Sequence, residues 1–309
     1  MAVAIVRRVL ALVPVLFVIS AVTFLLMHSV PGSPFQAEDK PLPPQIKANL
    51  EAFYGLDKPL AQQYVDYMGK ALRGDLGPSY LNRTRTVNDI IATHLPPSAL
   101  LGVLGLAVAL VIGVPLGILS AVRQNTWVDY AGMFVAVGGV SVPAMTLGPL
   151  LIWGVALKLD LLPVARWGTW QHAVLPALTL GLGHAAILAR LTRASMLQVI
   201  HQDYIRTARS KGVGERVVVT KHALRNALIP VITVVGPLFA ALVTGSMVVE
   251  EIFAIPGLGS YFVDSVSSRD YPVIMGTTLL YSVVLVVANL VVDLSYTLID
   301  PRIRLGDAA

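Results

Sequence analysis

The hydrophobic pattern of the chain is a series of long apolar runs separated by polar segments. Six runs of about 20 residues occur, and that length is what an α-helix needs to cross a bilayer. Backbone amides find no water to bond in hydrocarbon, so we expect each run to form a spanning helix. The predicted spans are Val9 to Met27, Ser98 to Val122, Ala131 to Leu157, His172 to Leu188, Ala227 to Val249 and Pro272 to Leu298.

Positive charges are distributed unevenly between the two sets of segments that flank these spans. The set that contains both chain ends carries 13 Lys and Arg residues and five acids, whereas the other carries 10 basic residues and 12 acids. Cytoplasmic segments are enriched in Lys and Arg. We therefore expect both termini to be cytoplasmic, with an even number of spans.

The first run follows Arg7 and Arg8, as the apolar part of a secretory signal would. It is too long for such a signal, and His28 to Pro31 offer no small-residue cleavage site, so we expect a retained helix. The chain then divides into residues 1–28, an extracytoplasmic segment 29–97 and a five-helix core 98–309. In segment 29–97 the spacing of Tyr54, Tyr64 and Tyr67 favours short amphipathic helices.

The cytoplasmic segment 189–226 carries eight basic residues, which keeps it in water. Its apolar positions from Met196 to Ala208 follow helical spacing, and Gly212 stands where a helix would end. A second helical run from Arg216 to Leu228 leads into the fifth span. A short helix of this kind can fill a groove in a soluble partner, and it can equally rest on anionic lipid.

Composition supports a membrane protein and excludes several other classes. Of 309 residues, 55% are hydrophobic, only 13% are charged and none is Cys; the mean hydropathy is +0.72. A disordered chain, a disulfide scaffold and a thiolate metal site are therefore excluded. Aromatic residues make up only 7%, which argues against a nucleic-acid-binding surface.

Polar residues recur along the last predicted span, where each has two readings. They can line a translocation path, or they can hold helices together and lean toward the interface. The candidates for the path are Thr277, Thr278, Ser282, Asn289 and Asp293. His184 in the fourth span has no second ligand at metal spacing, so we expect no metal site.

Acidic residues gather at the outer end of the fifth span and in the loop after it. Carboxylates at the mouth of a pathway can receive the basic surface of a protein that delivers a substrate, or they can simply lie at the membrane interface. The candidates for such docking are Glu250, Glu251, Asp264 and Asp270.

Several motifs together resemble the permease subunits of peptide ABC importers, most closely the B-type permease of oligopeptide importers. The main one is Asp203-Tyr204-Ile205-Arg206-Thr207-Ala208-Arg209-Ser210-Lys211-Gly212, followed by a run from Lys221 to Pro230. Gly74 to Ser79, Glu250 to Gly259 and Ile299 to Arg304 also match. The general importer signature has Glu-Ala-Ala where this chain has Arg206-Thr207-Ala208, a departure that favours the peptide branch.

The resemblance implies an all-α membrane protein with six spans and the MetI-like architecture of type I ABC importer permeases, in a bacterial inner membrane. It implies that residues 203–212 couple to a cytoplasmic ATPase, and that the partners are a second permease, two ATPase subunits and an extracytoplasmic peptide-binding protein. The chain has no phosphate-binding loop, because Gly69-Lys70 is followed by Ala71. We therefore expect no enzyme activity and no cofactor in this chain, with ATP and Mg bound by the ATPases.

The resemblance leaves the cargo open between oligopeptides, dipeptides, nickel chelates and glutathione. A stand-alone secondary carrier is the alternative of another class, but it would need an acid near the middle of a span, and only Asp293, near one end, is available. A membrane hydrolase using Ser141 and His184 lacks a Gly-x-Ser-x-Gly elbow.

Overall fold

The computed structural model describes residues 2–30, 32, 34–35, 43–82 and 84–299. Side chains are described for this set except residues 2–12, 140 and 293–299. Within the described residues the regular structure is helical, apart from an isolated antiparallel bridge between Pro78 and Thr86.

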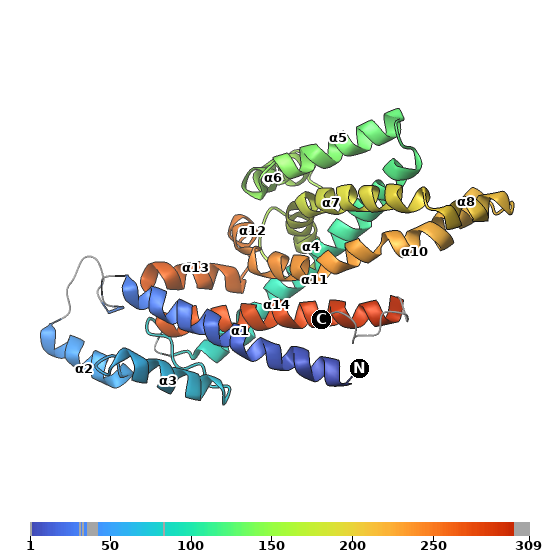
Figure 1. Cartoon of the computed structure of the whole chain (residues 1–309). Helices are drawn as coiled ribbons and strands as arrows, with labels where there is room; N and C mark the ends of the chain where they lie inside the picture. Colours follow the sequence, from blue (N-terminus) through green and yellow to red (C-terminus); the bar gives the residue numbers. More distant parts are fainter. Residues whose placement is uncertain (1, 31, 33, 36–42, 83, 300–309) are drawn as a thin grey trace. The chain divides into compact units, whose positions relative to one another are not determined.

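Most helices follow one another with connections of a few residues, and longer segments follow α1, α3 and η1 (Figure 1). In the first half they are α1 (Ala2–Ser29), α2 (Pro44–Tyr54), α3 (Leu60–Ala71), α4 (Val87–Val122), α5 (Trp127–Ser141), α6 (Ala144–Leu151) and the π-helix η1 (Ile152–Lys158). In the second half they are α7 (Trp170–Ile200), α8 (Asp203–Ser210), α9 (Glu215–Val217), the π-helix η2 (Val218–Ala223), α10 (Leu224–Ala227), α11 (Ile229–Thr244), α12 (Met247–Ile252), α13 (Leu258–Ser268) and α14 (Tyr271–Ile299).

The helices carry the long apolar stretches of a multi-pass membrane protein. Among the described residues, three helices are each long and apolar enough to cross a bilayer, namely Val87–Val122, Trp170–Ile200 and Tyr271–Val292. Two bent pairs, 127–158 and 215–244, pass the same test, and Val13–Ser29 is a shorter apolar helix. These segments coincide with the six apolar runs, although the number of crossings remains a prediction.

Helix α4 begins earlier than the sequence pattern predicts. The Thr86 hydroxyl donates to Asp89 Oδ2 at 2.7 Å, and the Asp89 amide donates back to the Thr86 hydroxyl at 3.1 Å. This reciprocal capping satisfies amides that the first helical turn leaves free. The helix then continues through Pro96 and Pro97, where the apolar run had suggested a boundary.

The predicted third and fifth spans are both broken. After α5 the chain bends by 101° before α6, and Pro143 at this point cannot donate the backbone bond that would continue α5. Between α10 and α11 the bend is 52°, directly before Pro230. Hydropathy does not detect the first bend, because the residues on both sides of it are apolar. The second bend lies at the start of the predicted fifth span, directly after the polar residues Arg225 and Asn226.

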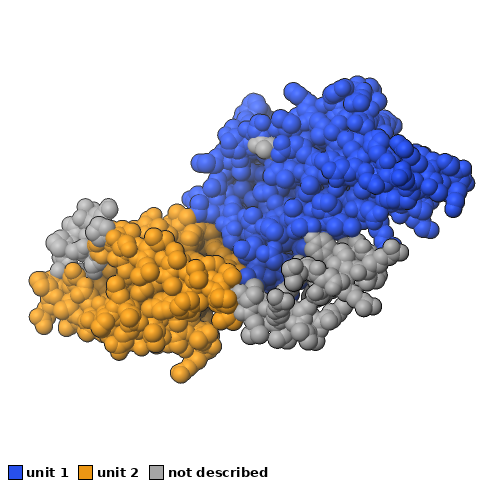
Figure 2. Space-filling view, in the orientation of Figure 1, with its two compact units in different colours: residues 1, 97–256, 285–309 blue, residues 2–96, 257–284 orange. Residues whose placement is uncertain are grey.

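The contacts divide the chain into two compact units (Figure 2). Unit 1 comprises residues 97–256 and 285–309, and unit 2 comprises residues 2–96 and 257–284. In unit 1, α4 and α7 approach closely at glycines: a Cβ at Gly117 would lie 2.5 Å from the Ala189 carbonyl oxygen, and one at Gly113 would lie 2.4 Å from that of Ala185. Small residues thus allow two apolar helices to pack backbone against backbone.

The core of unit 1 is formed by large apolar side chains from α4, α7, α11 and the region of α12. Leu101, Leu175, Leu242 and Phe253 are each at most 1% exposed and belong to one cluster. Such close packing fixes the helices that flank the segment 189–226, which the sequence predicts to be cytoplasmic.

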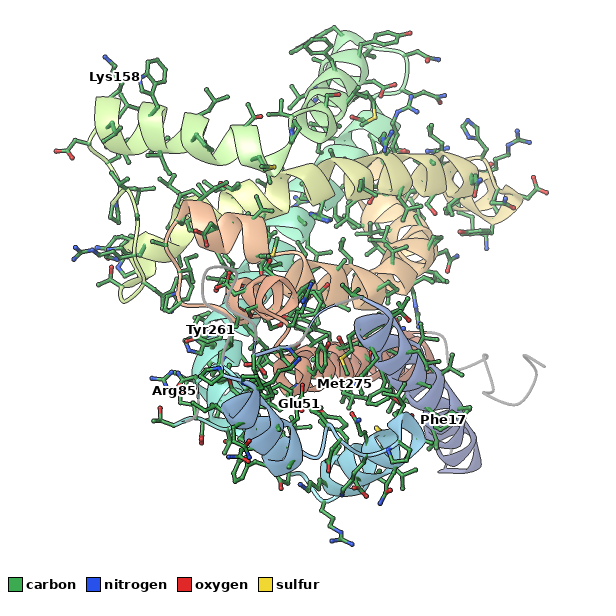
Figure 3. All side chains as sticks on the ribbon, turned by 90° about the vertical axis from the view of Figure 1, so that its left-hand side faces the viewer. Phe17, Glu51, Arg85, Lys158, Tyr261 and Met275 are labelled. Atoms are coloured by element: carbon green, nitrogen blue, oxygen red, sulfur yellow. The ribbon has the colours of Figure 1, made fainter. Side chains whose placement is uncertain are left out.

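Unit 2 is built from α1, α2, α3, α13 and the first turns of α4 and α14. The Tyr64 hydroxyl lies 2.8 Å from the Ser20 hydroxyl, which attaches α3 to α1. Tyr261 of α13, labelled in Figure 3, lies 4.3 Å from the His94 ring of α4, measured between ring centres. The Asp270 carboxylate, which is 2% exposed, accepts bonds from the Ser79 hydroxyl and the Tyr80 amide and so orders that loop.

Candidate functional site

The short helix α8 lies in the segment that the sequence predicts to be a coupling element. Asp203 occupies its first turn and Arg209 its last, so each charge faces the helix end that favours it. Gly212 follows with a φ of +78°, a left-handed conformation that glycine adopts without strain. The sequence therefore fixes where this helix begins and ends.

One face of α8 is packed against its own chain. Ile205 is 0% exposed and shares a cluster with Met196 of α7 and with Val218 and Ala223 of η2. Ala208 lies in the same cluster. These two residues of the predicted coupling set therefore position the helix and offer no surface to a partner.

The other face of α8 is exposed. It carries Asp203, Tyr204, Arg206, Thr207, Arg209 and Ser210, and the last two residues of the predicted set, Lys211 and Gly212, follow the helix and are also exposed. The alternation of an anchored apolar face with an exposed polar face is what the amphipathic spacing predicted.

Polar contacts hold α8 to the helices that follow it. Arg209 binds Glu215 through two bonds, Nε to Oε2 at 3.0 Å and Nη2 to Oε1 at 2.6 Å. The Asn226 amide donates to the Tyr204 hydroxyl at 2.8 Å. Together with the buried cluster, these bonds make α8 a stiff extension of α7 and α10.

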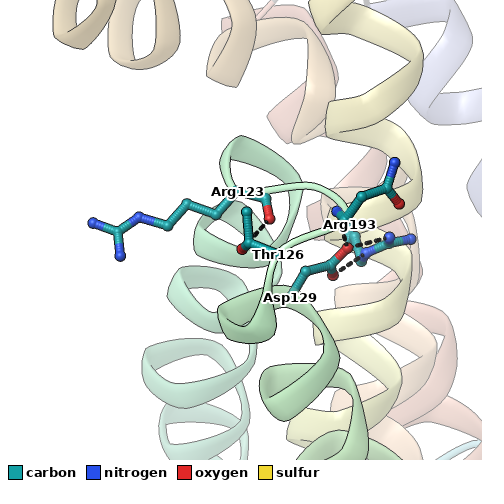
Figure 4. Close-up of polar contacts among 5 residues, drawn as sticks. Arg123, Thr126, Asp129 and Arg193 are labelled. Atoms are coloured by element: carbon teal, nitrogen blue, oxygen red, sulfur yellow. Dashed lines mark hydrogen bonds and ion pairs between the residues drawn. The ribbon is translucent and has the colours of Figure 1, made fainter.

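A buried ion pair joins the start of α5 to α7, shortly before α8 (Figure 4). Arg193 Nε donates to Asp129 Oδ1, and Arg193 Nη2 donates to Asp129 Oδ2, both at 2.7 Å. The Asp129 side chain is 1% exposed and that of Arg193 is 26% exposed. The Asn125 amide also donates to Asp129 Oδ2, at 3.1 Å. Two-point pairing of this kind fixes orientation as well as distance.

Sequence patterning does not reveal this pair, because Asp129 and Arg193 count there only as separate charges in the predicted cytoplasmic segments. The residues are 64 positions apart, so no local spacing connects them. The available signal was weak, because Asp129 is one of five acids among the 13 basic residues of the predicted cytoplasmic segments.

Two of the polar candidates on α14, Thr277 and Ser282, form hydrogen bonds within their own helix. The Thr277 hydroxyl donates to the Val273 carbonyl oxygen at 2.6 Å, and the Ser282 hydroxyl donates to that of Thr278 at 2.8 Å. Thr277 and Ser282 are buried, whereas Thr278 and Asn289 are half-buried. The side chain of Asp293 lies outside the described residues.

The four acids predicted for docking fall into two groups. Glu250 is 0% exposed, and its Oε1 accepts bonds from the Ser98 hydroxyl at 2.6 Å and the Ser246 hydroxyl at 2.5 Å. Asp270 is buried in the loop contact described above. Glu251 and Asp264 are exposed. In this conformation only the exposed pair can meet another protein.

The whole chain is similar to known transport proteins. Residues 113–305 match the family model of binding-protein-dependent transport system inner membrane components, and residues 1–101 match the N-terminal model of such membrane components. The dipeptide transport system permease protein DppB of Bacillus subtilis is 48% identical over 97% of both chains. The oligopeptide transport system permease protein OppB of Salmonella typhimurium is 41% identical, and the glutathione transport system permease protein GsiC of Escherichia coli O6:H1 is 45% identical; each match covers 97% of this chain and 98% of the relative.

Solved structures support the fold of the core. An inward-facing structure of the MetNI methionine ABC transporter matches with a TM-score of 0.56 at 19% identity, covering 68% of this chain and 96% of that one. An amino acid ABC transporter crystallised with histidines gives a TM-score of 0.52 at 16% identity, covering 67% and 92%. The fold class predicted from the sequence is thus confirmed as an all-helical ABC importer permease fold. On these matches the chain belongs to the family of binding-protein-dependent transport system inner membrane components, in the branch of the oligopeptide and dipeptide ABC permeases.

Proposed function

We propose that this protein is the transmembrane permease subunit of an ATP-driven peptide importer in a bacterial inner membrane. It crosses the bilayer six times, keeps both termini in the cytoplasm, and forms one half of the pathway beside a homologous second permease. The names of its relatives specify dipeptides, oligopeptides and glutathione, all of which contain peptide bonds. Short peptides, with oligopeptides foremost, are therefore the cargo.

The observation that carries this proposal is the construction of α8. Its apolar face is fixed to α7, η2 and α10 through Ile205 and Ala208, while its polar face is free to bind another protein. A helix held in this way transmits a push without bending. Its partner is a pair of cytoplasmic ATPases, because the chain has no phosphate-binding loop of its own.

The coupling then works as a mechanical linkage. ATP binding and hydrolysis change the separation of the two ATPases, and each carries its bound α8 with it. Helix α7 has 31 residues and is about 46 Å long, so it extends well beyond the roughly 30 Å hydrocarbon layer. Movement of α8 therefore reaches the spans and opens the pathway to one side at a time.

Exposed acids at the proposed outer end and polar residues of α14 are the candidates for receiving and passing the cargo. Glu251 and Asp264 are the acids available to an extracytoplasmic peptide-binding protein. Thr278, Asn289 and Asp293 remain candidates for the path, whereas the buried hydroxyls of Thr277 and Ser282 serve packing.

Cross-linking tests the position of α8 directly, because the chain contains no Cys. We expect Ser210→Cys to cross-link to an ATPase subunit in isolated membranes. The exposed Ser267, on the proposed outer side, gives the matched control Ser267→Cys, which should not cross-link. Labelling of Ser210→Cys only by lipid-linked reagents throughout turnover would favour the alternative of a helix resting on the membrane.

A deletion tests the linkage itself. Removing residues 203–211, or changing Gly212→Pro, should abolish ATP-driven peptide uptake while the chain still inserts into the membrane. Peptide uptake at the normal rate after this deletion, with ATP consumption still coupled, would contradict the proposed function.

A further inference from the structure

Unit 2 contains a cavity of about 510 Å³, within the range of small-molecule sites. Its walls come from the end of α1, the end of α2, one face of α3, the loop 75–80 and the start of α14. Met27 of α1 and Met275 of α14 both line it, and Figure 3 labels Met275. The coupling mechanism proposed above does not use this cavity.

Aromatic rings form much of the wall and hold one another in place. Tyr80 lies 4.6 Å from Tyr54 and 6.2 Å from Tyr271, measured between ring centres. The His28 ring lies 4.2 Å from that of Phe24 and 4.8 Å from that of Tyr271. The Asp270 carboxylate fixes the backbone of Tyr80, so the ring wall is formed before any ligand arrives.

Two polar atoms of lining residues are shielded from solvent and have no hydrogen-bond partner among the described residues. They are the Tyr67 hydroxyl oxygen and His28 Nε2. Burial raises the pKa of Tyr67, so at neutral pH its hydroxyl keeps a proton to donate. His28 Nδ1 lies 2.8 Å from the Phe24 carbonyl oxygen, which can only accept. Nδ1 therefore carries the proton, and in the neutral ring Nε2 is left as an acceptor.

The shielded polar groups without a partner thus amount to one donor and one acceptor at the wall of a cavity lined with aromatic rings. A peptide bond presents the complementary set, a carbonyl oxygen that accepts and an N–H that donates. An aromatic or large apolar side chain complements the rings. Leaving buried polar groups unpaired is costly, so this pattern favours a site that is completed by a ligand.

We propose that this cavity binds a short peptide with an aromatic side chain, the Tyr67 hydroxyl donating to a peptide carbonyl and His28 Nε2 accepting from a peptide N–H. The inference rests on the proposed function, since it assigns an additional cargo site to the same importer. Lys58 and Asp66 at the wall are paired at 2.7 Å and exposed, so they do not compete for the peptide bond.

The test uses the full chain in nanodiscs and the photoreactive dipeptide alanyl-(4-benzoyl)phenylalanine as the probe. We expect adducts on residues that line the cavity, Met27 and Met275 foremost, and competition by excess alanyl-phenylalanine. The concentration for half-maximal labelling should rise roughly tenfold in Tyr67→Phe and in His28→Phe. Tyr64→Phe is the matched control on the same helix, because that hydroxyl already has Ser20 as its partner; it should leave labelling unchanged.

The stability of the variants separates loss of a ligand contact from loss of folding. Tyr67→Phe removes a hydroxyl without a protein partner, so thermal unfolding of the ligand-free protein should not shift downward. Equal labelling of all variants, adducts outside the cavity, or competition by phosphatidylethanolamine and not by dipeptide would each overturn the inference.

Cell uptake distinguishes this inference from the proposed function. Uptake of trialanine, which has no ring, should survive Tyr67→Phe and fail after deletion of residues 203–211. Absence of peptide uptake by the unaltered importer refutes the proposed function, whereas uptake without labelling of the cavity refutes the inference alone.

Discussion

Replacing Asp129 with asparagine tests the ion pair that connects α5 to α7. The substitution leaves the side chain in place, so the bond from the Asn125 amide has an oxygen to accept it, but Arg193 loses its counter-charge and one of its two bonds. Removing one partner of a fully buried pair costs about 3 to 5 kcal/mol. Because Arg193 is 26% exposed and can partly rehydrate, we expect Asp129→Asn to cost about 2 to 3 kcal/mol.

The matched control is an ion pair with the same length and different burial. Lys58 and Asp66 are also 2.7 Å apart, but their side chains are 44% and 45% exposed. Exposed pairs contribute about 0 to 1 kcal/mol, so Asp66→Asn should cost less than Asp129→Asn by a measurable margin. The difference between the two variants then reflects burial together with the second bond that Arg193 makes to Asp129.

The assay is unfolding by sodium dodecyl sulfate in mixed micelles, followed by circular dichroism. A double-mutant cycle with Arg193→Gln isolates the coupling between the two residues, which we expect to exceed 1 kcal/mol, within the range of about 0.5 to 3 found for contacting residues. A coupling near zero, or equal costs for Asp129→Asn and Asp66→Asn, would refute the argument from burial.

Two further pairs of substitutions, each a variant and its control, test the packing of α4 against α7 and the role of a buried acid. Gly117→Ala places a Cβ 2.5 Å from the Ala189 carbonyl oxygen, so we expect it to lower the free energy of unfolding by about 1 to 3 kcal/mol. The control Gly154→Ala meets no atom within 4 Å and should be neutral or slightly stabilising. Equal thermal unfolding of the two variants would contradict the close approach of α4 to α7. Glu250→Ala leaves two buried serine hydroxyls without their carboxylate and should lower the free energy of unfolding by about 2 to 4 kcal/mol. Glu251→Ala should leave stability intact and weaken binding of the extracytoplasmic peptide-binding protein, which titration calorimetry measures. The opposite ranking would place Glu250 at the docking surface.

Periodicity and turn chemistry were sufficient to predict helix α8, the proposed coupling element. The apolar spacing through Ile205 and Ala208 identified the face that is buried, and Gly212 identified the end. Local signals suffice here because a helix of this length is defined by residues close together in the sequence.

Long-range contacts could not be predicted from the same signals. Ser98 and Glu250 are 152 residues apart, and only the folded chain brings them together. For this reason the sequence pattern places Glu250 at a docking surface, whereas the folded chain buries its carboxylate. The early start of α4 had a readable signal in Thr86 and Asp89, but the Pro96-Pro97 pair concealed it.

The unbroken length of α7 has a consequence for the size of the motion that drives transport. After Pro176 in its second turn the helix has no further proline, so this part of α7 tilts as one rigid body. The part after Pro176, residues 177–200, is about 36 Å long, so a tilt of about 10° around its midpoint displaces each end by about 3 Å in opposite directions. In the proposed mechanism, a small displacement of the end of α7 next to α8 is therefore enough to shift the other end by about the width of a water molecule.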